Sequence, residues 1–290
     1  MINNEEADAL HNFYTSLITF EGTRYDWQKL VLPVNAVLEK KQSPNALIVS
    51  GDQHSLSEIS GLEVVAHQFY MPFLIAKWVR HMGGADKNKA VGLRGLKYWW
   101  KFCHRAARAV LGSRQQKMLK RQALRALNIS ASHLQGFSAG VQSNARFVVT
   151  LEDDGLLALE TTLETALDFI LESCSPGAEA FFDISESFSF EQLGADHIVA
   201  ESERFRLGQT DQTVVKVRIP FPNTLCATVM SRELVKSWCA YLKKSLASKV
   251  VRLTPIDWLL NRFILSQDFP PQSAFFHFDP GVVRQLSLNR

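Results

Sequence analysis

The chain has 290 residues, of which 46% are hydrophobic and 21% charged, so it can bury a sizeable core and does not have the composition of a disordered protein. No apolar stretch approaches the roughly 20 residues that a membrane-spanning helix needs. The four cysteines lie far apart and form no C-x-x-C pair, which argues against a zinc site or a disulfide framework. Because the N-terminal stretch is acidic and lacks the layout of a signal peptide, we expect a cytoplasmic protein.

The formal net charge of +3 is unevenly distributed along the chain. Residues 77–125 contain fourteen lysines or arginines and a single acid, Asp86, which gives this segment a net charge of +13. The rest of the chain therefore carries −10. Such a segregated basic segment is typical of a surface that faces a polyanion.

The first half of the chain predicts mostly helices. Apolar residues at helical spacing predict an amphipathic helix over residues 4–19. The apolar run 46–52, which ends in Gly-Asp, predicts a buried strand followed by a turn, and 62–67 predicts a second strand. Helices are expected over residues 71–81, 85–112, 114–127 and 130–144.

The second half alternates strands and helices. The clearest strand is RFVVTL (146–151), because its β-branched and aromatic residues are bounded by polar ones. Helices are expected over 157–174, 232–247 and 255–267, and further strands over 179–185, 197–202, 214–219 and 224–231. This alternation predicts a single α/β domain over residues 1–290, with a mostly parallel sheet and a basic, aromatic helical insertion at 77–125.

Three consecutive acids, Glu152, Asp153 and Asp154, follow the clearest strand. In open α/β sheets ligands bind beyond the carboxyl ends of the strands, and a hard divalent cation takes one or two carboxylates together with substrate phosphates. The alternative is structural, since Asp153 or Asp154 could cap a helix that begins near Gly155. Phosphate-binding loops of the G-x-x-x-x-G-K-[ST] and G-x-G-x-x-G types are absent.

The stretch SHLQGFSAGVQSNARFVVTLEDDGLL resembles the centre of glycosyltransferase family 25, the lipopolysaccharide-biosynthesis type. The matching positions are a Ser-His pair on a helix and a Leu-Glu-Asp-Asp strand end. Three later stretches resemble further elements of the family, in the same order. All matching positions are Ser132, His133, Leu151, Glu152, Asp153, Asp154, Thr224, Ser231, Arg232, Pro255, Asp257, Pro280, Gln285 and Ser287. The resemblance covers roughly residues 129–288, and the family's opening strand has no clear counterpart.

The resemblance implies a GT-A fold, in which a nucleotide-binding α/β sheet carries a metal-dependent sugar transfer. Mn²⁺ or Mg²⁺ would bridge the diphosphate of a nucleotide sugar, such as a UDP-sugar. Asp154 is then the expected metal ligand, with Glu152 or Asp153 assisting through water or the ribose. Members of the family are generally inverting, so a base must take the proton of the attacking hydroxyl, and the carboxylate of Asp257 is the candidate.

Further site residues are expected with open alternatives. His277 is a candidate additional metal ligand, or else a buried structural residue. His133 is expected to make a structural hydrogen bond that holds the strand-end loop. Asp257 is as well explained as a first-turn acid of its helix. Asp52 could contact the nucleotide, although turn formation explains it better.

The basic segment 77–125 has aromatic residues among its cations, as in a helix that lies at a membrane interface. An anionic membrane surface or a lipid-linked saccharide acceptor would suit it, and a solvated helical face is the structural alternative. Nucleic acid is disfavoured, because no recognised nucleic-acid-binding motif accompanies the charge. The sequence thus predicts a cytoplasmic, peripherally membrane-associated glycosyltransferase of a bacterial surface glycan. A phosphotransfer enzyme and a non-catalytic binding protein remain alternatives.

Overall fold

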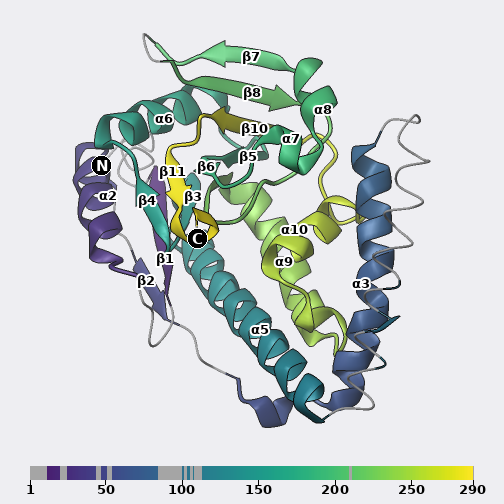
Figure 1. The fold of residues 1–290 in the computed structure, drawn as a ribbon. Helices are drawn as coiled ribbons and strands as arrows, with labels where there is room; N and C mark the ends of the chain where they lie inside the picture. The colour runs from purple at the N-terminus through teal and green to yellow at the C-terminus, as the bar shows by residue number, and fades with distance from the viewer. Residues whose placement is uncertain are drawn as a thin grey trace. The chain divides into compact units, whose positions relative to one another are not determined.

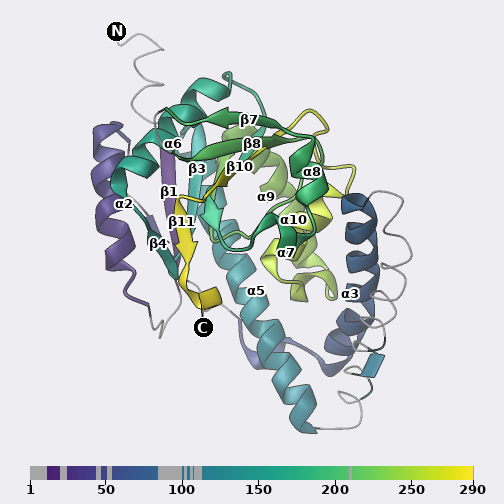
Figure 2. The same cartoon turned by 45° about the horizontal axis from the view of Figure 1, so that its top comes forward.

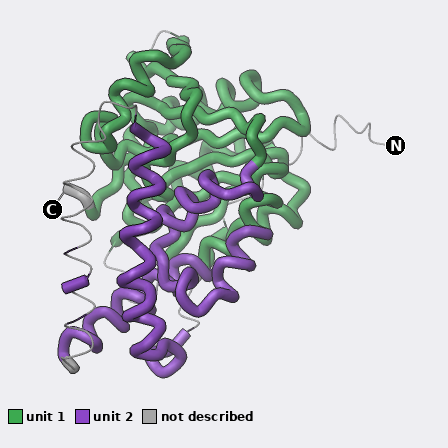
Figure 3. The backbone as a smooth tube through the Cα atoms, turned by 90° about the vertical axis from the view of Figure 1, so that its right-hand side faces the viewer, with its two compact units in different colours: residues 1–50, 132–239, 270–290 green, residues 51–131, 240–269 purple. Residues whose placement is uncertain are grey.

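The fold is described from a computed structural model, which covers residues 12–19, 25–43, 47–50, 54–83, 100, 103–104, 107, 113–208 and 211–289. The chain divides into two compact units (Figure 3). Unit 1 comprises Met1–Ser50, Ser132–Cys239 and Pro270–Arg290, and unit 2 comprises Gly51–Ala131 and Ala240–Phe269. Each unit is therefore assembled from segments that are far apart in the sequence.

Unit 1 is built on an eight-stranded mixed sheet with the order β2-β1-β3-β9-β5-β10-β8-β7 (Figure 1). Six strands point in one direction, whereas β8 and β9 run antiparallel to their neighbours. The expectation of an α/β protein is confirmed. The strand bounds are β1 Phe13–Thr19, β2 Leu47–Ser50, β3 Phe147–Glu152, β5 Ala180–Asp183, β7 Glu203–Arg206, β8 Thr213–Val217, β9 Ala227–Ser231 and β10 Ala274–Asp279.

The strand directions bring several chain ends to one edge of this sheet. β1, β3, β5 and β10 share a direction, so their carboxyl ends, including Glu152 and Asp183, lie at the same edge. The antiparallel strand β9 separates β3 from β5 and begins at this edge, directly after Cys226. Polar residues from distant segments therefore converge there.

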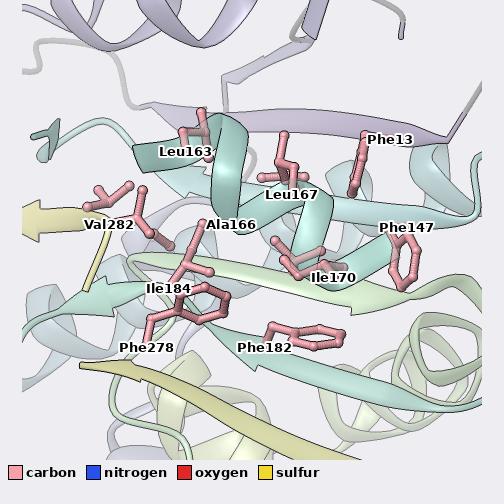
Figure 4. Packing of buried hydrophobic residues seen from close by; sticks show 14 of the residues in the cluster. Phe13, Phe147, Leu163, Ala166, Leu167, Ile170, Phe182, Ile184, Phe278 and Val282 are labelled. Atoms are coloured by element: carbon pink, nitrogen blue, oxygen red, sulfur yellow. The ribbon is translucent and has the colours of Figure 1, made fainter. Parts of the chain in front are cut away.

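One face of the sheet is covered by α2 (Gln28–Lys40) and α6 (Glu160–Ser173). Figure 4 shows Leu163, Leu167 and Ile170 of α6 packed against sheet residues that include Phe147 and Phe182. The residues drawn belong to one continuous core of fully buried side chains. Burial of each such side chain contributes about 1.5–3 kcal/mol, so this core is the main source of stability of unit 1.

The opposite face of the sheet meets the C-terminal part of α5 (Ser113–Gln142). A methyl group added at Gly140 would come within 2.7 Å of a Val148 side-chain carbon, and one at Gly136 within 2.9 Å of the Ser16 hydroxyl. The two glycines let the helix backbone approach the strands closely. His133, one turn earlier, is carried to the end of β3 by the same packing.

A second, three-stranded sheet in unit 1 has the order β4-β11-β6. Its strands are β4 Gly155–Leu157, β6 Ser185–Glu186 and β11 Val283–Gln285. In Figure 2, β11 runs beside β4, with which it pairs antiparallel, and Gln285 lies opposite Gly155. The small sheet thus brings residues 283–285 to the turn that follows β3, next to the three acids. The 3₁₀ turn η4 (Leu286–Asn289) follows β11, and unit 1 also contains the short helices α7 Phe190–Leu193 and α8 Asp196–Ala200.

Unit 2 is helical in the part that the structure describes. Its largest element is α3 (Gly61–Met82), which starts with a capping box. Ser60 Oγ accepts a hydrogen bond from the Glu63 backbone N–H at 3.1 Å, and the Glu63 carboxylate accepts one from the Ser60 N–H at 3.1 Å. A small core of Ile59, Val64, Leu119, Ala123, Leu127 and Leu253 joins its segments. The remaining elements are η1 Leu56–Glu58, η3 Val251–Leu253 and α10 Ile256–Ile264, together with the parts of α5 and α9 (Arg232–Ala247) that belong to this unit.

Three predicted elements are wrong. Residues 13–19 form β1 rather than a helix, because they pair with strands on both sides and are buried throughout. Residues 62–67 belong to α3, since the capping box overrides the strand pattern. The predicted strand at 197–202 contains the short helix α8 instead.

The other predicted strands and helices within the described residues are confirmed in kind. Helices predicted separately at 114–127 and 130–144 form one continuous α5, and the helix predicted at 71–81 is the second half of α3. Most of 85–112 lies outside the described residues, as do 4–11. Among the described helices, none is long and apolar enough to cross a membrane.

Candidate metal centre

Glu152 ends β3, and Asp153 and Asp154 form the turn that joins β3 to β4. Gly155 begins a strand, and the next helix, α6, starts only at Glu160, with Leu159 as an N-cap that makes no side-chain cap hydrogen bond. The interpretation of Asp153 or Asp154 as a helix cap is therefore wrong. The acids need another explanation than the start of a helix.

Glu152 and Asp154 are brought together with Cys226. One ligand atom from each of these side chains lies within 4.8 Å of the other two. Asp154 and Cys226 are buried, whereas the Glu152 side chain is 23% exposed, so the group opens toward solvent on the side of Glu152. The Cys226 thiol lies 3.9 Å from Asp154 Oδ1 as a hydrogen-bond donor.

The end of the chain closes over these carboxylates. The Gln285 amide nitrogen lies 3.3 Å from Asp154 Oδ2 and 3.5 Å from Glu152 Oε2. The Leu286 backbone N–H donates to the Asp154 carbonyl at 2.8 Å, and the Ser287 hydroxyl bonds to the Asp154 carboxylate. Gln285 and Ser287 are distant from the acids in the sequence, and the fold brings both of them into contact with Asp154.

His133 contacts the same group from α5. Its Nε2 lies 3.4 Å from Glu152 Oε1, and the side chain is fully buried. The contact fits the expected role of a histidine that holds the strand-end loop. Ser231 and Arg232 also bind backbone groups, since Ser231 Oγ accepts from the Ala180 N–H at 2.9 Å and Arg232 Nε donates to the Val141 carbonyl at 3.1 Å.

The carboxylates of Glu152 and Asp154 place two negative charges close together. Burial raises the pKa of the Asp154 carboxyl, and the charge of Glu152 raises it further, although hydrogen bonds from Ser287 and Gln285 oppose the shift. In the described part of the chain, no lysine or arginine pairs with either carboxylate. A divalent cation would supply the missing positive charge, so the residues present fit a hard metal ion.

Cys226 is not expected to contribute a thiolate to such an ion. Burial raises the pKa of its thiol well above the usual range, and the charges of Glu152 and Asp154 raise it further. A neutral thiol is a poor ligand for Mn²⁺ or Mg²⁺, which prefer oxygen. We therefore regard the two carboxylates as the ligands and Cys226 as part of the wall.

His277 lies elsewhere at the same edge, in the middle of β10. It is not part of the Glu152–Asp154–Cys226 group; its ring stacks on Phe221 with centroids 4.3 Å apart, and its Nδ1 lies 3.7 Å from Asp183 Oδ2. Burial lowers the pKa of His277 to about 3. The imidazole is therefore neutral at physiological pH, and its contact with Asp183 is not an ion pair. Its role as a metal ligand stays a prediction.

Asp183 is a buried acid that the sequence analysis did not select. Burial raises its pKa to about 6, although its carboxylate accepts hydrogen bonds from Ser185 Oγ at 2.6 Å and from the Asn223 N–H at 2.7 Å. A signal was present, because Asp183 follows the apolar run of the predicted strand 179–185, much as the three acids follow the predicted strand 146–151. Cys226 carried no comparable signal, since its proximity to the acids depends on how β9 pairs with β3.

Of the remaining predicted site residues, the structure describes Asp153 and Asp257. Asp153 is buried and its N–H donates to the Ile18 carbonyl at 2.9 Å. Asp257 is a first-turn residue of α10 in unit 2, and its catalytic role stays a prediction. Asp52 lies outside the described residues.

Unit 1 contains a cavity of about 610 Å³ that has Gln285, the residue that contacts both carboxylates, in its wall. The lining is mostly polar and acidic and includes the aromatic side chains of Phe188 and Phe190. Its charged residues are Glu186, Glu191, Asp196, Asp279 and Arg284. The size is that of a small-molecule site, for which about 300–1,000 Å³ is usual.

No protein-family model matches the chain, and no curated protein is significantly similar to it.

Proposed function

We propose that the protein is a metal-dependent glycosyltransferase with a GT-A-type fold, which moves a sugar from a nucleotide-diphosphate sugar to a saccharide acceptor of a bacterial surface glycan. One observation carries the proposal. Glu152 and Asp154 gather at the carboxyl end of β3, no lysine or arginine among the described residues pairs with them, and Gln285 and Ser287 from a distant segment close over them. Two separate stretches that resemble the family thus meet at one point.

In this proposal Asp154 and Glu152 hold Mn²⁺ or Mg²⁺. When bound, the ion supplies positive charge that neutralises the departing nucleoside diphosphate. Gln285 orients the two carboxylates by donating its amide hydrogens to them, and His133 fixes Glu152 from the other side. Asp153 is assigned to the ribose or to a metal-bound water, as the resemblance implies.

We assign the saccharide acceptor to the cavity lined by Gln285. Carboxylates such as Glu191 and Asp196 accept hydrogen bonds from sugar hydroxyls, and aromatic faces such as that of Phe188 pack against the apolar side of a pyranose ring. Asp257 remains the proposed base for an inverting transfer.

The test measures nucleoside diphosphate release and nucleotide-sugar binding across a panel of donors, with Mn²⁺, with Mg²⁺ and with EDTA. Wild type is expected to bind at least one donor only with metal. Asp154→Asn should lose this binding by about tenfold or more, because a charged metal ligand becomes neutral. Asp211→Asn, at an exposed aspartate in the same unit, is the matched control and should behave as wild type.

Each contrary outcome has a clear reading. Metal-independent binding, or no binding to any donor, contradicts the proposal. Metal-dependent binding of a nucleotide without sugar transfer favours a phosphotransfer enzyme or a binding protein. Asp257→Asn should abolish transfer while donor binding persists; unchanged transfer would remove Asp257 as the base.

A further inference from the structure

Unit 2 contains a second cavity, of about 550 Å³, formed wholly within that unit. We call it the unit-2 cavity. Its walls come from α3, the end of α9, η3 and α10 with the segment that follows. The lining residues are Tyr70, Phe73, Leu74, Lys77, Tyr241, Lys244, Ser245, Ser248, Val251, Arg262, Leu265, Ser266, Gln267 and Asp268.

Arg262 is the central charged group of this cavity. Its Nη1 donates hydrogen bonds to the Tyr241 hydroxyl and, at 3.4 Å, to Ser245 Oγ, and Tyr70 also bonds to the guanidinium. The guanidinium carbon lies 5.3 Å from the centroid of the Tyr241 ring. All of these partners are neutral, and among the described residues no carboxylate pairs with Arg262.

Another arginine of the same unit shows the contrast. Arg252 is half-buried like Arg262, but its Nη2 lies 3.1 Å from the Glu63 carboxylate and donates to the Glu58 carbonyl at 2.9 Å. A structural arginine in this unit is thus matched with an acid. A half-buried guanidinium with neutral partners only is costly unless an anion completes its charge.

The charges around Arg262 are also positive. Lys77 and Lys244 line the cavity with exposed side chains, and Asp268 is its single acid. Asp268 Oδ2 lies 3.6 Å from Lys244 Nζ, and the two side chains are 49% and 78% exposed, respectively. Such an exposed ion pair neutralises little of the positive charge in the cavity. The lining carries a net charge of +2. Its buried phenol also remains a hydrogen-bond donor, because burial raises the pKa of Tyr241 to about 12.

The cavity has room for more than a bare anion. Its volume falls within the usual range for small organic ligands, about 300–1,000 Å³. The lining also includes apolar side chains, namely Phe73, Leu74, Val251 and Leu265. Such a lining suits a ligand with an anionic group and an organic body.

We propose that the unit-2 cavity binds the phosphate group of an organic phosphate ester, with Arg262 as the principal anion-binding side chain and Lys77 and Lys244 as supporting cations. A planar guanidinium matches phosphate oxygens in bidentate fashion, and hydroxyl and ammonium donors complete such sites. The site is separate from the carboxylates of unit 1, so it stands or falls independently of the glycosyltransferase proposal. A soluble ester and a lipid headgroup share this chemistry.

The test uses the full chain and three probes: inorganic pyrophosphate, a sugar 1-phosphate, and phosphatidylcholine vesicles with and without phosphatidic acid. Calorimetry and vesicle sedimentation measure binding. Arg262→Gln should weaken binding of the preferred probe about tenfold or more, and Lys244→Gln severalfold. Lys243→Gln is the matched control, because it removes the same charge from the neighbouring position of α9, outside the cavity, and should bind as wild type.

The results distinguish a lipid headgroup from a soluble ester as the ligand. Tighter binding of phosphatidic acid vesicles identifies a lipid headgroup, and tighter binding of the sugar 1-phosphate identifies a soluble ester, provided that Arg262→Gln reduces it. Binding of pyrophosphate alone would contradict an ester as the ligand. The proposal would be overturned if no probe binds, or if Arg262→Gln melts at the wild-type temperature and still binds as wild type. It would also be overturned if Lys243→Gln and Lys244→Gln lose affinity equally. If Arg262→Gln does not fold, binding is measured instead with the double variant Lys77→Gln/Lys244→Gln, and Lys243→Gln remains the control.

Discussion

At the scale of single residues, the Gln285 amide is the one described donor that reaches both carboxylates of the metal centre. Gln285→Lys would place an ammonium there and neutralise part of the crowded charge. We expect the protein without metal to melt about 2 °C higher, which corresponds to roughly 1 kcal/mol in a chain of this length. We also expect the stabilisation by Mn²⁺ to disappear, because the ammonium competes with the ion.

Thermal unfolding with Mn²⁺ and with EDTA checks this prediction. Gln272→Lys provides the control, since Gln272 also donates to a carboxylate, that of Glu179, at an exposed place. It should keep the full Mn²⁺ response. A Gln285→Lys protein that Mn²⁺ stabilises as strongly as wild type would show that the ion, if it binds, binds elsewhere.

His277 gives a second prediction at this scale, through pH. Its pKa is lowered from 6.5 to about 3 in the folded protein, so the neutral imidazole contributes stability that is present above pH 6.5 and is lost as the pH falls toward 3. Between pH 6.5 and about pH 4.5 this loss amounts to about 2–3 kcal/mol. His277→Phe keeps an aromatic ring against Phe221 and should not show this loss of stability between pH 6.5 and about pH 4.5.

Urea unfolding in EDTA at several pH values measures the difference between the two proteins. Asp183 acts in the opposite direction, because its pKa is raised to about 6 and its neutral form stabilises the fold only at lower pH. Its contribution is present in both proteins and largely cancels in the comparison. Parallel stability curves for wild type and His277→Phe would contradict the assigned pKa of His277.

At the scale of elements, the small sheet positions Gln285, and Gly281 is where that sheet is most tightly constrained. A methyl group added at Gly281 would lie 2.4 Å from backbone atoms of Ser185 and Glu186 in β6. Gly281→Ala should therefore displace β11 and cost about 1–3 kcal/mol. The stabilisation by Mn²⁺ should weaken as well, since Gln285 moves with the strand.

Denaturant unfolding and the Mn²⁺ thermal shift test this prediction together. Gly177→Ala serves as a control, because a methyl group there meets nothing within 4 Å, although its positive φ of 81° adds local strain. That variant can lose some stability, but its Mn²⁺ response should be unchanged. Full Mn²⁺ stabilisation in Gly281→Ala would show that β11 does not position the metal centre.

The elements also show which features a sequence can predict. Strand 146–151 was recognisable because β-branched and aromatic residues are clearly bounded, and it carries the acids that form the centre. Residues 13–19 form a strand, although their pattern predicts a helix. A strand buried on both faces has no alternating pattern, and the spacing of Phe13 and Leu17 also fits a helix. The capping box at Ser60 and Glu63 was visible in the sequence and would have corrected the 62–67 prediction.

The candidate site was only partly predictable for a related reason. Glu152 and Asp154 are near neighbours in the sequence, so strand geometry alone predicts that they meet. Cys226 and Gln285 join them through the pairing of β9 with β3 and of β11 with β4. Register between distant strands depends on long-range packing, which a single sequence does not specify.

At the scale of the whole molecule, the sequence separates a segment of charge +13, residues 77–125, from a remainder of charge −10. The unit-2 cavity includes Lys77 from this segment, but its central Arg262 lies outside it. Pocket binding and surface attraction can therefore be distinguished by mutation. A diffuse basic surface depends on the number of charges and on salt, whereas a pocket depends on one geometry.

The last prediction concerns this basic segment. Reversing the charge of four of its residues, Lys97, Lys101, Arg105 and Arg108, should abolish sedimentation with vesicles that contain anionic lipid. Each basic residue near such a surface contributes about 1 kcal/mol, so the four reversals should lower partitioning by more than about 100-fold. Higher salt should weaken wild-type binding in the same direction, because it screens the attraction.

The control must change the net charge equally at other positions. Four exposed basic residues outside the segment are suitable, namely Arg204, Arg218, Lys243 and Lys249. If binding follows the location of the charge, reversing these four leaves most of the sedimentation intact. If both variants lose binding equally, only the net charge of the protein matters, and the basic segment is a solvated surface rather than a membrane-binding one.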